Sequence, residues 1–237
     1  MGNTLYVECP FTSFPRSFAR DYKETYLYPP PSTVYGFLLS LVGEEDLTAH
    51  LGVKLAIGII GDTPPISRIV RKQRNHKFSN GGTEHKKRVE KYGEGFYPPS
   101  QFSKPNFQEL LTDLKIVIKL DSNHESATVK LDERVAIALS SPEQITRFGG
   151  LCLGESWALV NGIRTYRHED GLIRWLFPDN RGLIALPVWI NRQTSQGKFQ
   201  RFSLVEYKEF DETGWIEIQG DAIPNQGKSR SSKRKSS

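Results

Sequence analysis

Hydrophobic residues recur at helical spacing in the stretch YPPPSTVYGFLLSLVGE, residues 28–44. The three prolines before them restrict the chain, because each proline ring holds φ at about −65° and removes a backbone donor. Ser32 stands at a predicted N-cap, and Gly43 is placed to end the helix in a left-handed turn. A helix so short and apolar is not stable alone, so we expect it to pack against a sheet.

Alternating or continuous apolar runs predict strands on both sides of this helix. In the first half of the chain these runs are residues 4–9, 53–60, 66–74 and 114–120. A helical turn is expected at 107–111. Leu131, Val135 and Leu139 repeat at intervals of four, which predicts a second core helix within 126–140.

The rest of the chain is predicted to be strand after strand. The expected strands are 157–160, 162–167, 172–177, 183–190, 201–210 and 215–218, with a hairpin turn at 179–182. A βαβ-type first half followed by antiparallel strands predicts the α+β class.

The stretch PFTSFPRSFARDYKETY, residues 10–26, interleaves aromatic rings with cations, and we call it the basic-aromatic loop. Its rings are Phe11, Phe14, Phe18 and Tyr22, and its cations are Arg16, Arg20 and Lys23. Rings and cations together suit stacking on bases and contact with phosphates. The alternative is that the rings cover the edge of the sheet and the cations are solvated.

Residues 75–102 have few aliphatic side chains and four glycines, so this stretch cannot bury itself and is expected to project as a loop or an extended hairpin. The cations from 71 to 91 are Arg71, Lys72, Arg74, Lys77, Lys86, Lys87, Arg88 and Lys91, opposed by Glu84 and Glu90. A long basic insertion in a compact domain favours contact with a nucleic-acid backbone, and a merely solvated loop is the alternative.

Residues 147–156, RFGGLCLGES, form what we call the glycine-rich segment. Glycine allows positive φ and a close approach of the backbone to a ligand, and exposed amides can hold a phosphate. The segment matches neither GxGxxG nor a Walker loop, and taken alone such a stretch is also compatible with a simple turn.

Composition and charge limit the classes of function. The chain has 237 residues, of which 37% are hydrophobic, and a formal net charge of +5, which favours an anionic partner only weakly. No apolar run is long enough for a membrane helix and no signal peptide is evident, so a cytoplasmic protein is expected. Two distant cysteines and five scattered histidines predict neither a disulfide framework nor a bound metal, and no cofactor motif is found.

Three stretches follow one another along the chain. The first is the first strand together with the basic-aromatic loop, the second is YPPPSTVYGFLLSLVGE, and the third is RFGGLCLGES. Together they resemble the CRISPR-associated protein 5 family, within the RAMP superfamily of RNA-binding proteins, and most of all its type I-B members. The resemblance implies a ferredoxin-like, RRM-related domain over residues 1–150, with a protruding basic β-hairpin thumb at about 71–102. A β-rich region would follow at 151–220, and composition predicts a disordered basic tail at 221–237.

The resemblance implies a non-catalytic RNA-binding subunit of Cascade, the type I surveillance complex, that caps the 5′ handle of the guide RNA (crRNA). Its partners would be the backbone subunit, the large subunit and a guide-processing endonuclease. The complex would bring it to target DNA near the PAM, for interference or, with transposition proteins, for transposon targeting. The alternatives are a metal-independent endoribonuclease that processes precursor crRNA, with His76 or His85 as acid or base, and a purely structural bridge.

The resemblance also implies which residues contact RNA. Arg16, Arg20 and Lys23 would lie near the handle, and Tyr35 would face either the handle or the core. The thumb cations Arg71, Lys72, Arg74 and Lys77 would hold phosphates, and Gly149, Gly150 and Gly154 would let the backbone wrap RNA. His76 and Arg147 would also bind RNA. The type I-C branch cuts RNA with a tyrosine, a lysine and a histidine. No Lys-His pair follows the thumb here, where the strand has the sequence LKIVIKL, so we expect no catalysis.

Overall fold

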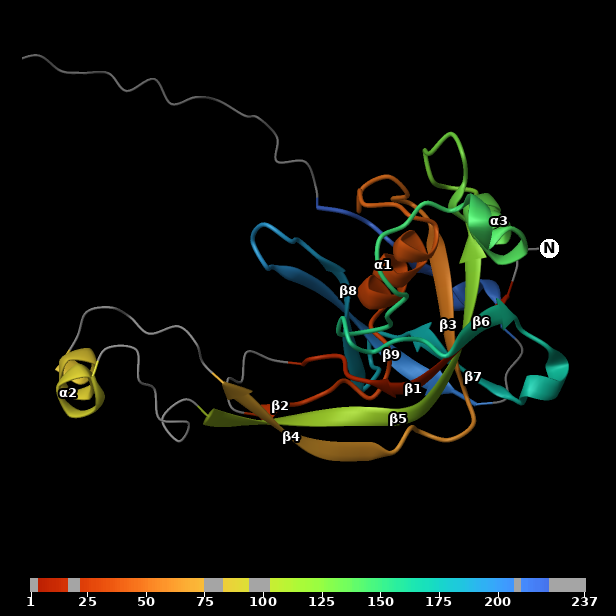
Figure 1. Ribbon diagram of the computed structural model, residues 1–237. Coiled ribbons are helices and arrows are strands. Elements are labelled where there is room, and N and C mark those ends of the chain that lie inside the picture. Colours follow the sequence, from red (N-terminus) through yellow and green to blue (C-terminus); the bar gives the residue numbers. More distant parts are fainter. Residues whose placement is uncertain (1–3, 17–21, 75–82, 94–102, 207–209, 222–237) are drawn as a thin grey trace, which may run out of the picture.

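The computed structural model describes residues 4–16, 22–74, 83–93, 103–206 and 210–221 (Figure 1). The helices are α1 (Pro31–Leu41), α2 (Thr83–Tyr92) and α3 (Leu131–Ser140), and the 3-10 turns are η2 (Pro142–Gln144), η3 (His168–Asp170) and η4 (Glu212–Gly214). The strands are β1 (Leu5–Thr12), β2 (Tyr22–Lys23), β3 (Lys54–Ile60), β4 (Ile66–Arg74), β5 (Ser103–Asp121), β6 (Gly162–Thr165), β7 (Ile173–Pro178), β8 (Ile184–Ile190), β9 (Gly197–Val205) and β10 (Ile216–Glu217). The α+β content matches the predicted class.

The described strands form one large sheet. Its main path runs β6-β1-β5-β3-β7-β9-β8, and every neighbouring pair on this path is antiparallel. β10 is added beside β3, while β2 and β4 are added beside β5. The β2–β5 pairing is parallel. β5 is therefore the central strand, because it pairs with β1, β2, β3 and β4.

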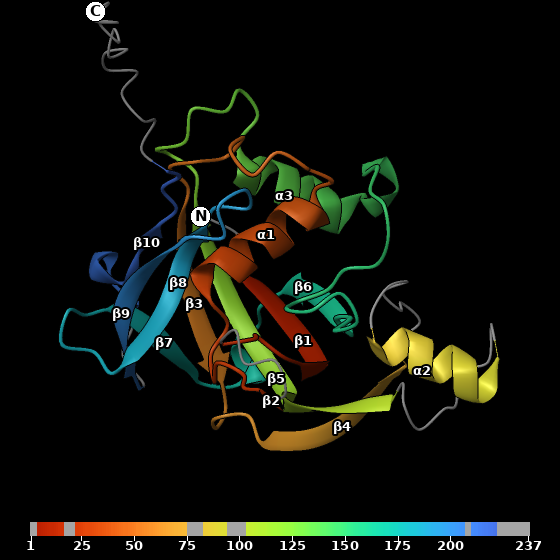
Figure 2. The ribbon, with the colours of Figure 1, turned by 90° about the vertical axis from the view of Figure 1, so that its left-hand side faces the viewer.

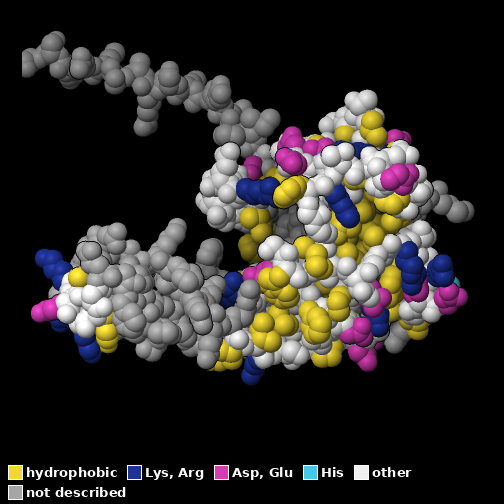
Figure 3. Space-filling view, in the orientation of Figure 1, with side chains coloured by type: hydrophobic (Ala, Val, Ile, Leu, Met, Phe, Trp, Pro, Cys, Tyr) yellow, Lys and Arg dark blue, Asp and Glu magenta, His cyan; other side chains and the backbone are white. Residues whose placement is uncertain are grey.

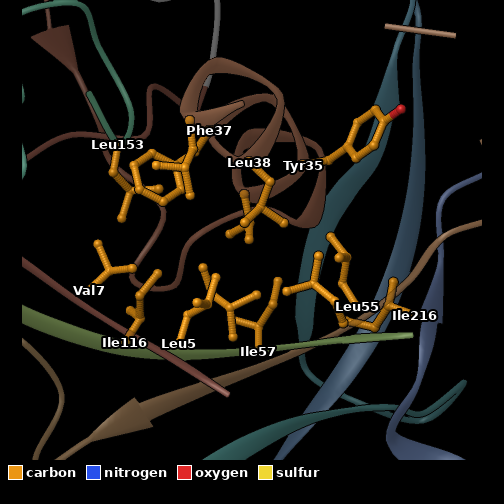
Figure 4. Close-up of a cluster of buried hydrophobic side chains, with 14 of the residues drawn as sticks. Leu5, Val7, Tyr35, Phe37, Leu38, Leu55, Ile57, Ile116, Leu153 and Ile216 are labelled. Atoms are coloured by element: carbon orange, nitrogen blue, oxygen red, sulfur yellow. The ribbon is translucent and has the colours of Figure 1, made fainter. Parts of the chain in front are cut away.

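The main core lies between the sheet and the two helices α1 and α3, which cover the same face (Figures 1 and 2). Phe37 and Leu38 of α1 point at Leu5, Ile57 and Ile116 on three neighbouring strands (Figure 4). All five side chains are buried. Full burial of such a side chain contributes about 1.5–3 kcal/mol, so packing against the sheet accounts for the stability of this short helix.

A second apolar cluster closes part of the opposite face of the sheet. Ala56, Val117 and Trp175 are buried there, and Phe210 packs against them. The ring centroids of Trp175 and Phe210 lie 5.0 Å apart, and the Lys119 ammonium lies 4.9 Å from the centroid of the Phe210 ring. This part of the face is therefore already occupied.

β4 and the first part of β5 form a two-stranded ribbon that projects from the body (Figure 1). Pairing runs from Ile66 opposite Leu111 to Arg74 opposite Ser103. The predicted helical turn at 107–111 is wrong, because these residues pair with β4 as strand. The helix α2, seen beyond the far end of the ribbon, was not predicted.

Two local predictions about α1 have different outcomes. Gly43 has φ of 71°, which confirms the left-handed turn after the helix. The N-cap is Pro30 and not Ser32, so the predicted capping residue is wrong. The Ser32 hydroxyl instead donates to the carbonyl of Pro187 at 2.9 Å, and thereby joins α1 to β8.

Two predictions in the second half of the chain are also wrong. Residues 157–160 form no strand, and Leu159 makes only an isolated bridge to Cys152. The turn at 179–182 closes, since the Gly182 N–H donates to Asp179 O at 2.9 Å. It is not a hairpin turn, because β9 lies between β7 and β8 in the sheet.

Strands from both sides of residue 150 share the sheet. β6 pairs with β1, and β7 extends the sheet from β3. The division into 1–150 and 151–220 stays a prediction, and the tail after residue 221 lies outside the described residues. Among the described helices, none is long and apolar enough to cross a membrane.

Candidate nucleic-acid interface

The glycine-rich segment packs directly against the end of β1. The Thr12 hydroxyl donates to the carbonyl of Leu153, and both residues are fully buried. At Gly154, with φ of 108°, an added Cβ would lie 2.6 Å from the carbonyl oxygen of Ser13. A side chain does not fit here, so this glycine is needed for close packing of two segments far apart in sequence.

We therefore expect Gly154→Ala to destabilise the fold by about 2–3 kcal/mol, because it combines an unfavourable φ with a backbone clash. The matched control is Gly149→Ala, which has φ of 82° but open space around the added Cβ. Urea unfolding monitored by tryptophan fluorescence measures both. Equal losses for the two variants would show that the contact with Ser13 is unimportant.

Glu155 connects the glycine-rich segment to two strands. Its carboxylate accepts hydrogen bonds from Lys23 of β2, at 3.2 Å, and from Gln108 of β5. It also accepts one from the indole of Trp157 at 2.9 Å. The end of the basic-aromatic loop, the inner half of the ribbon and the glycine-rich segment therefore meet at one carboxylate.

The side chains of Lys23 and Arg16 differ in how available they are to a ligand. Lys23 is already paired with Glu155, and its side chain is 39% exposed. Arg16 is exposed, and its guanidinium lies 5.8 Å from the centroid of the Tyr26 ring. Its backbone N–H donates to Glu24 O at 2.8 Å, which holds the loop beside β2. Arg16 is thus the better candidate for a phosphate contact, while Arg20 lies outside the described residues.

The ribbon carries the predicted thumb cations on its outer half. Arg71, Lys72 and Arg74 belong to β4 and pair with Asn106, Pro105 and Ser103 of β5. His76 and Lys77 lie outside the described residues. In α2, exposed cations are present at Lys86, Lys87 and Lys91.

Tyr35 belongs to the core and not to the surface. Its side chain is 1% exposed, and its hydroxyl donates to Leu47 O at 2.9 Å. Burial raises the pKa of this phenol well above its usual value. Of the two positions predicted for Tyr35, facing the handle or facing the core, the structure shows the core.

Tyr35→Phe is expected to cost about 1 kcal/mol of folding stability, because it leaves the Leu47 carbonyl without its buried donor. We expect no change in affinity for RNA. Thermal unfolding and a binding titration on the same preparation check this. If the variant had unchanged stability but bound RNA more weakly, Tyr35 would have to be a residue that contacts RNA.

The remaining predicted residues lie in the exposed part of the glycine-rich segment. Arg147, Gly149 and Gly150 are all exposed. Sequence reasoning missed Gln108, Glu109 and Glu155, which hold the interface together. Glu109 accepts from the hydroxyl of Tyr22 at 2.7 Å and from the N–H of Thr25 at 3.1 Å. Single polar residues in a strand or loop carry no pattern that predicts such pairing.

The described residues offer cations and hydrogen-bond donors but no group of three or more His, Cys, Asp or Glu that could hold a metal. Burial raises the pKa of the Cys9 thiol to about 11, so this cysteine is protonated at neutral pH. The face shown in Figure 3 mixes basic, acidic and hydrophobic side chains and is not uniformly positive. This arrangement suits binding of an anionic chain at particular places, namely the basic-aromatic loop, the glycine-rich segment and the ribbon.

The fold and the interface define a mixed α+β protein with one large antiparallel sheet and exposed cationic segments. A family model described as "CRISPR-associated protein (Cas_Cas5)" matches residues 4–102. The chain is 32% identical over 200 residues to "CRISPR-associated protein Cas5" of Myxococcus xanthus, covering 81% of this chain and 85% of that one. The protein therefore belongs to the CRISPR-associated Cas5 family.

A solved structure has a similar fold. A chain of a "CRISPR RNA-guided surveillance complex" superposes with a TM-score of 0.57 at 12% sequence identity, covering 87% of this chain and 90% of that chain. The similarity extends over most of the chain and not only over the segment that the family model matches.

Proposed function

We propose that this protein is a non-catalytic, RNA-binding subunit of a type I-B Cascade complex that caps the 5′ handle of the crRNA. One observation carries the proposal. Glu155 joins the glycine-rich segment to Lys23 at the end of the basic-aromatic loop and to Gln108 in the inner half of the ribbon. The basic-aromatic loop and the glycine-rich segment, which the sequence singled out for RNA contact, thus meet at the ribbon whose outer half carries the thumb cations, and Arg16 of the loop is exposed.

We further propose that the first part of the sheet is the ferredoxin-like unit. The order β6-β1-β5-β3, with α1 between β1 and β3 and α3 between β5 and β6, supports this, because it is the βαββαβ arrangement. The ribbon with α2 would be the thumb. In an RRM the sheet face opposite the helices binds RNA. Here Trp175 and its neighbours occupy part of that face, so loops and ribbon would hold the RNA.

In the assembled complex we expect contacts with the backbone subunit, the large subunit and a guide-processing endonuclease, and through them with target DNA near the PAM. Membership of the Cas5 family and the similarity to a surveillance-complex chain support this assignment. We expect a cytoplasmic protein. In a transposon-encoded system, transposition proteins would join these partners.

The test is co-purification of the tagged chain with the products of neighbouring genes, followed by sequencing of the bound RNA. We expect short RNAs that share one repeat-derived 5′ end, and an affinity for that handle far above the affinity for a scrambled RNA of equal length. Recovery of the protein partners without RNA would favour the structural bridge and contradict the proposal.

We also expect no cleavage of precursor crRNA by the purified chain in EDTA. Tyr35 is enclosed in the core, which leaves its hydroxyl unable to meet a phosphate. Gel analysis of 5′-labelled precursor over an hour measures this, with a His76→Ala and His85→Ala double variant as the control. Site-specific products from the unaltered chain that the double variant does not form would establish the endoribonuclease instead.

A further inference from the structure

The outer surface of α1 forms the floor of a cavity of about 570 Å³. The floor is made by Gly36, Leu39 and Ser40 of α1, with Gly43 just after the helix. An added Cβ at Gly36 would meet nothing within 4 Å. The walls come from three segments: residues 44, 45 and 47 after α1, residues 146–148 at the start of the glycine-rich segment, and Arg192 in the turn between β8 and β9. A cavity of this size lies in the range of small-molecule sites.

One wall presents an aromatic ring that packs against no other part of the chain that the structure describes. Phe148 lines the cavity, and its side chain is fully exposed, with a relative area of 101%. Leaving a phenyl ring in water forgoes about 1.5–3 kcal/mol of burial. Gly149 follows it with φ of 82° and open space around it. The chain thus holds an exposed aromatic ring at the mouth of a cavity, where the ring offers a surface for stacking.

Two cations line the same cavity. Arg147 stands beside Phe148, and Arg192 comes from the turn between β8 and β9. Both are exposed, and within the described residues neither guanidinium has a hydrogen bond or an ion pair. Each keeps its full set of planar donors for a ligand, and guanidinium donors match the oxygens of a phosphate.

The acidic residues of the cavity do not neutralise these cations. Glu44 is committed elsewhere, because its carboxylate accepts from the guanidinium of Arg134 at 2.7 Å and from the N–H of Asp46 at 3.0 Å. The hydrogen bond from Arg134 lowers the pKa of Glu44. Glu45 is the other acidic residue of the lining. The cavity is therefore lined by two guanidiniums and one carboxylate that are available to a ligand.

We propose that this cavity takes one unstacked nucleotide of the bound RNA. Its base would lie against the Phe148 ring, and its phosphate would lie between Arg147 and Arg192. This inference rests on the proposed function, and it adds a defined base-stacking site where the start of the glycine-rich segment faces α1, at a cavity that Glu155 does not line. Stacking on an aromatic ring contributes about 1–3 kcal/mol per base and tolerates any base.

The experiment uses a set of handle RNAs with the repeat sequence of the CRISPR array that belongs to this protein. Each RNA has one abasic nucleotide at a different position, and fluorescence anisotropy measures the affinity of the protein for each. We expect one position at which loss of the base lowers affinity about tenfold. Phe148→Ala should lower affinity for the intact handle by the same factor, and the abasic change at that position should cost this variant nothing more. The control is Phe199→Ala, an exposed phenylalanine of β9 outside the cavity.

A second pair of variants tests the cations. Arg192→Glu is expected to weaken binding about tenfold, whereas Arg181→Glu, an exposed arginine outside the cavity lining, should leave it unchanged. Neither exposed arginine contributes to the core, so circular dichroism should be unaltered.

The outcomes separate this site from the function as a whole. Handle binding that needs the β4 cations but ignores Phe148 would overturn the nucleotide site alone. The nucleotide site would also be overturned if Phe148→Ala lowered the affinity equally for every abasic RNA. The same holds if Phe148→Ala caused a protein subunit to dissociate from complexes whose RNA had been removed by ribonuclease. No affinity of the unaltered chain for the handle would overturn both proposals together.

Discussion

Replacement of Arg71, Lys72 and Arg74 together by glutamate is expected to lower the affinity for handle RNA about 100-fold at moderate salt. The three residues lie in the outer part of β4, where the ribbon projects from the body (Figure 1). Each phosphate contact that is lost also removes about 0.7 from the slope of log affinity against log salt. The slope of the variant should therefore fall by about 2. Titrations at three salt concentrations measure both quantities.

The control must have the same net charge, because a +5 protein attracts any RNA weakly. Arg181, Lys198 and Arg201 are exposed cations of the turn after β7 and of β9. Their triple replacement by glutamate should change affinity less than threefold. Equal effects of the two triple variants would mean that only total charge matters, and the ribbon would lose its role in RNA binding.

Glu125→Ala is expected to cost about 3–5 kcal/mol of stability, the largest effect that we predict for one residue. Its side chain is 0% exposed and lies 2.9 Å from Nδ1 of His50. It also accepts from the N–H of Leu131, the first residue of α3. Arg134 completes the cluster, with Nη1 2.9 Å from Nε2 of His50. Removal of the carboxylate would leave two buried donors without an acceptor.

Denaturant unfolding of Glu125→Ala beside Glu133→Ala provides the matched comparison, because Glu133 is a nearby glutamate in the first turn of α3 and is exposed. The control should change stability by less than about 0.5 kcal/mol. Glu125→Gln should fall between the two, since its amide oxygen can still accept one hydrogen bond. A loss below about 1 kcal/mol for Glu125→Ala would mean that the cluster is not an integral part of the fold.

The elements predicted correctly are those whose own residues carry the pattern. The apolar spacing from Val34 to Leu41 predicts α1, and the apolar runs at 53–60 and 114–120 predict β3 and the inner part of β5. These segments are buried on a consistent face, so periodicity alone is sufficient. Gly43 likewise follows from a local requirement for positive φ.

The elements predicted wrongly depend on partners far away in sequence. Residues 107–111 are strand because β4 pairs with them. The turn at 179–182 does not make a hairpin, since β9 returns from residues 197–205 to separate β7 from β8. In α2 the apolar side chains are Val89 and Tyr92, so no apolar stripe indicated a helix.

The candidate site shows the same division. Sequence patterns singled out the cations and glycines, but they did not indicate that Lys23 is paired with Glu155 or that Gly154 serves packing against Ser13. Phe148 had a detectable signal, as an aromatic residue between an arginine and two glycines. Arg192 had none, because its place at the cavity depends on the turn between β8 and β9.

The most direct test places a photoreactive nucleotide at the 5′ end of the crRNA in the complete complex and identifies the crosslinked peptides by mass spectrometry. We predict crosslinks to this chain, within residues 4–26, 66–74 or 147–156. Crosslinks confined to other subunits, with a 5′ end that remains open to digestion, would contradict the account.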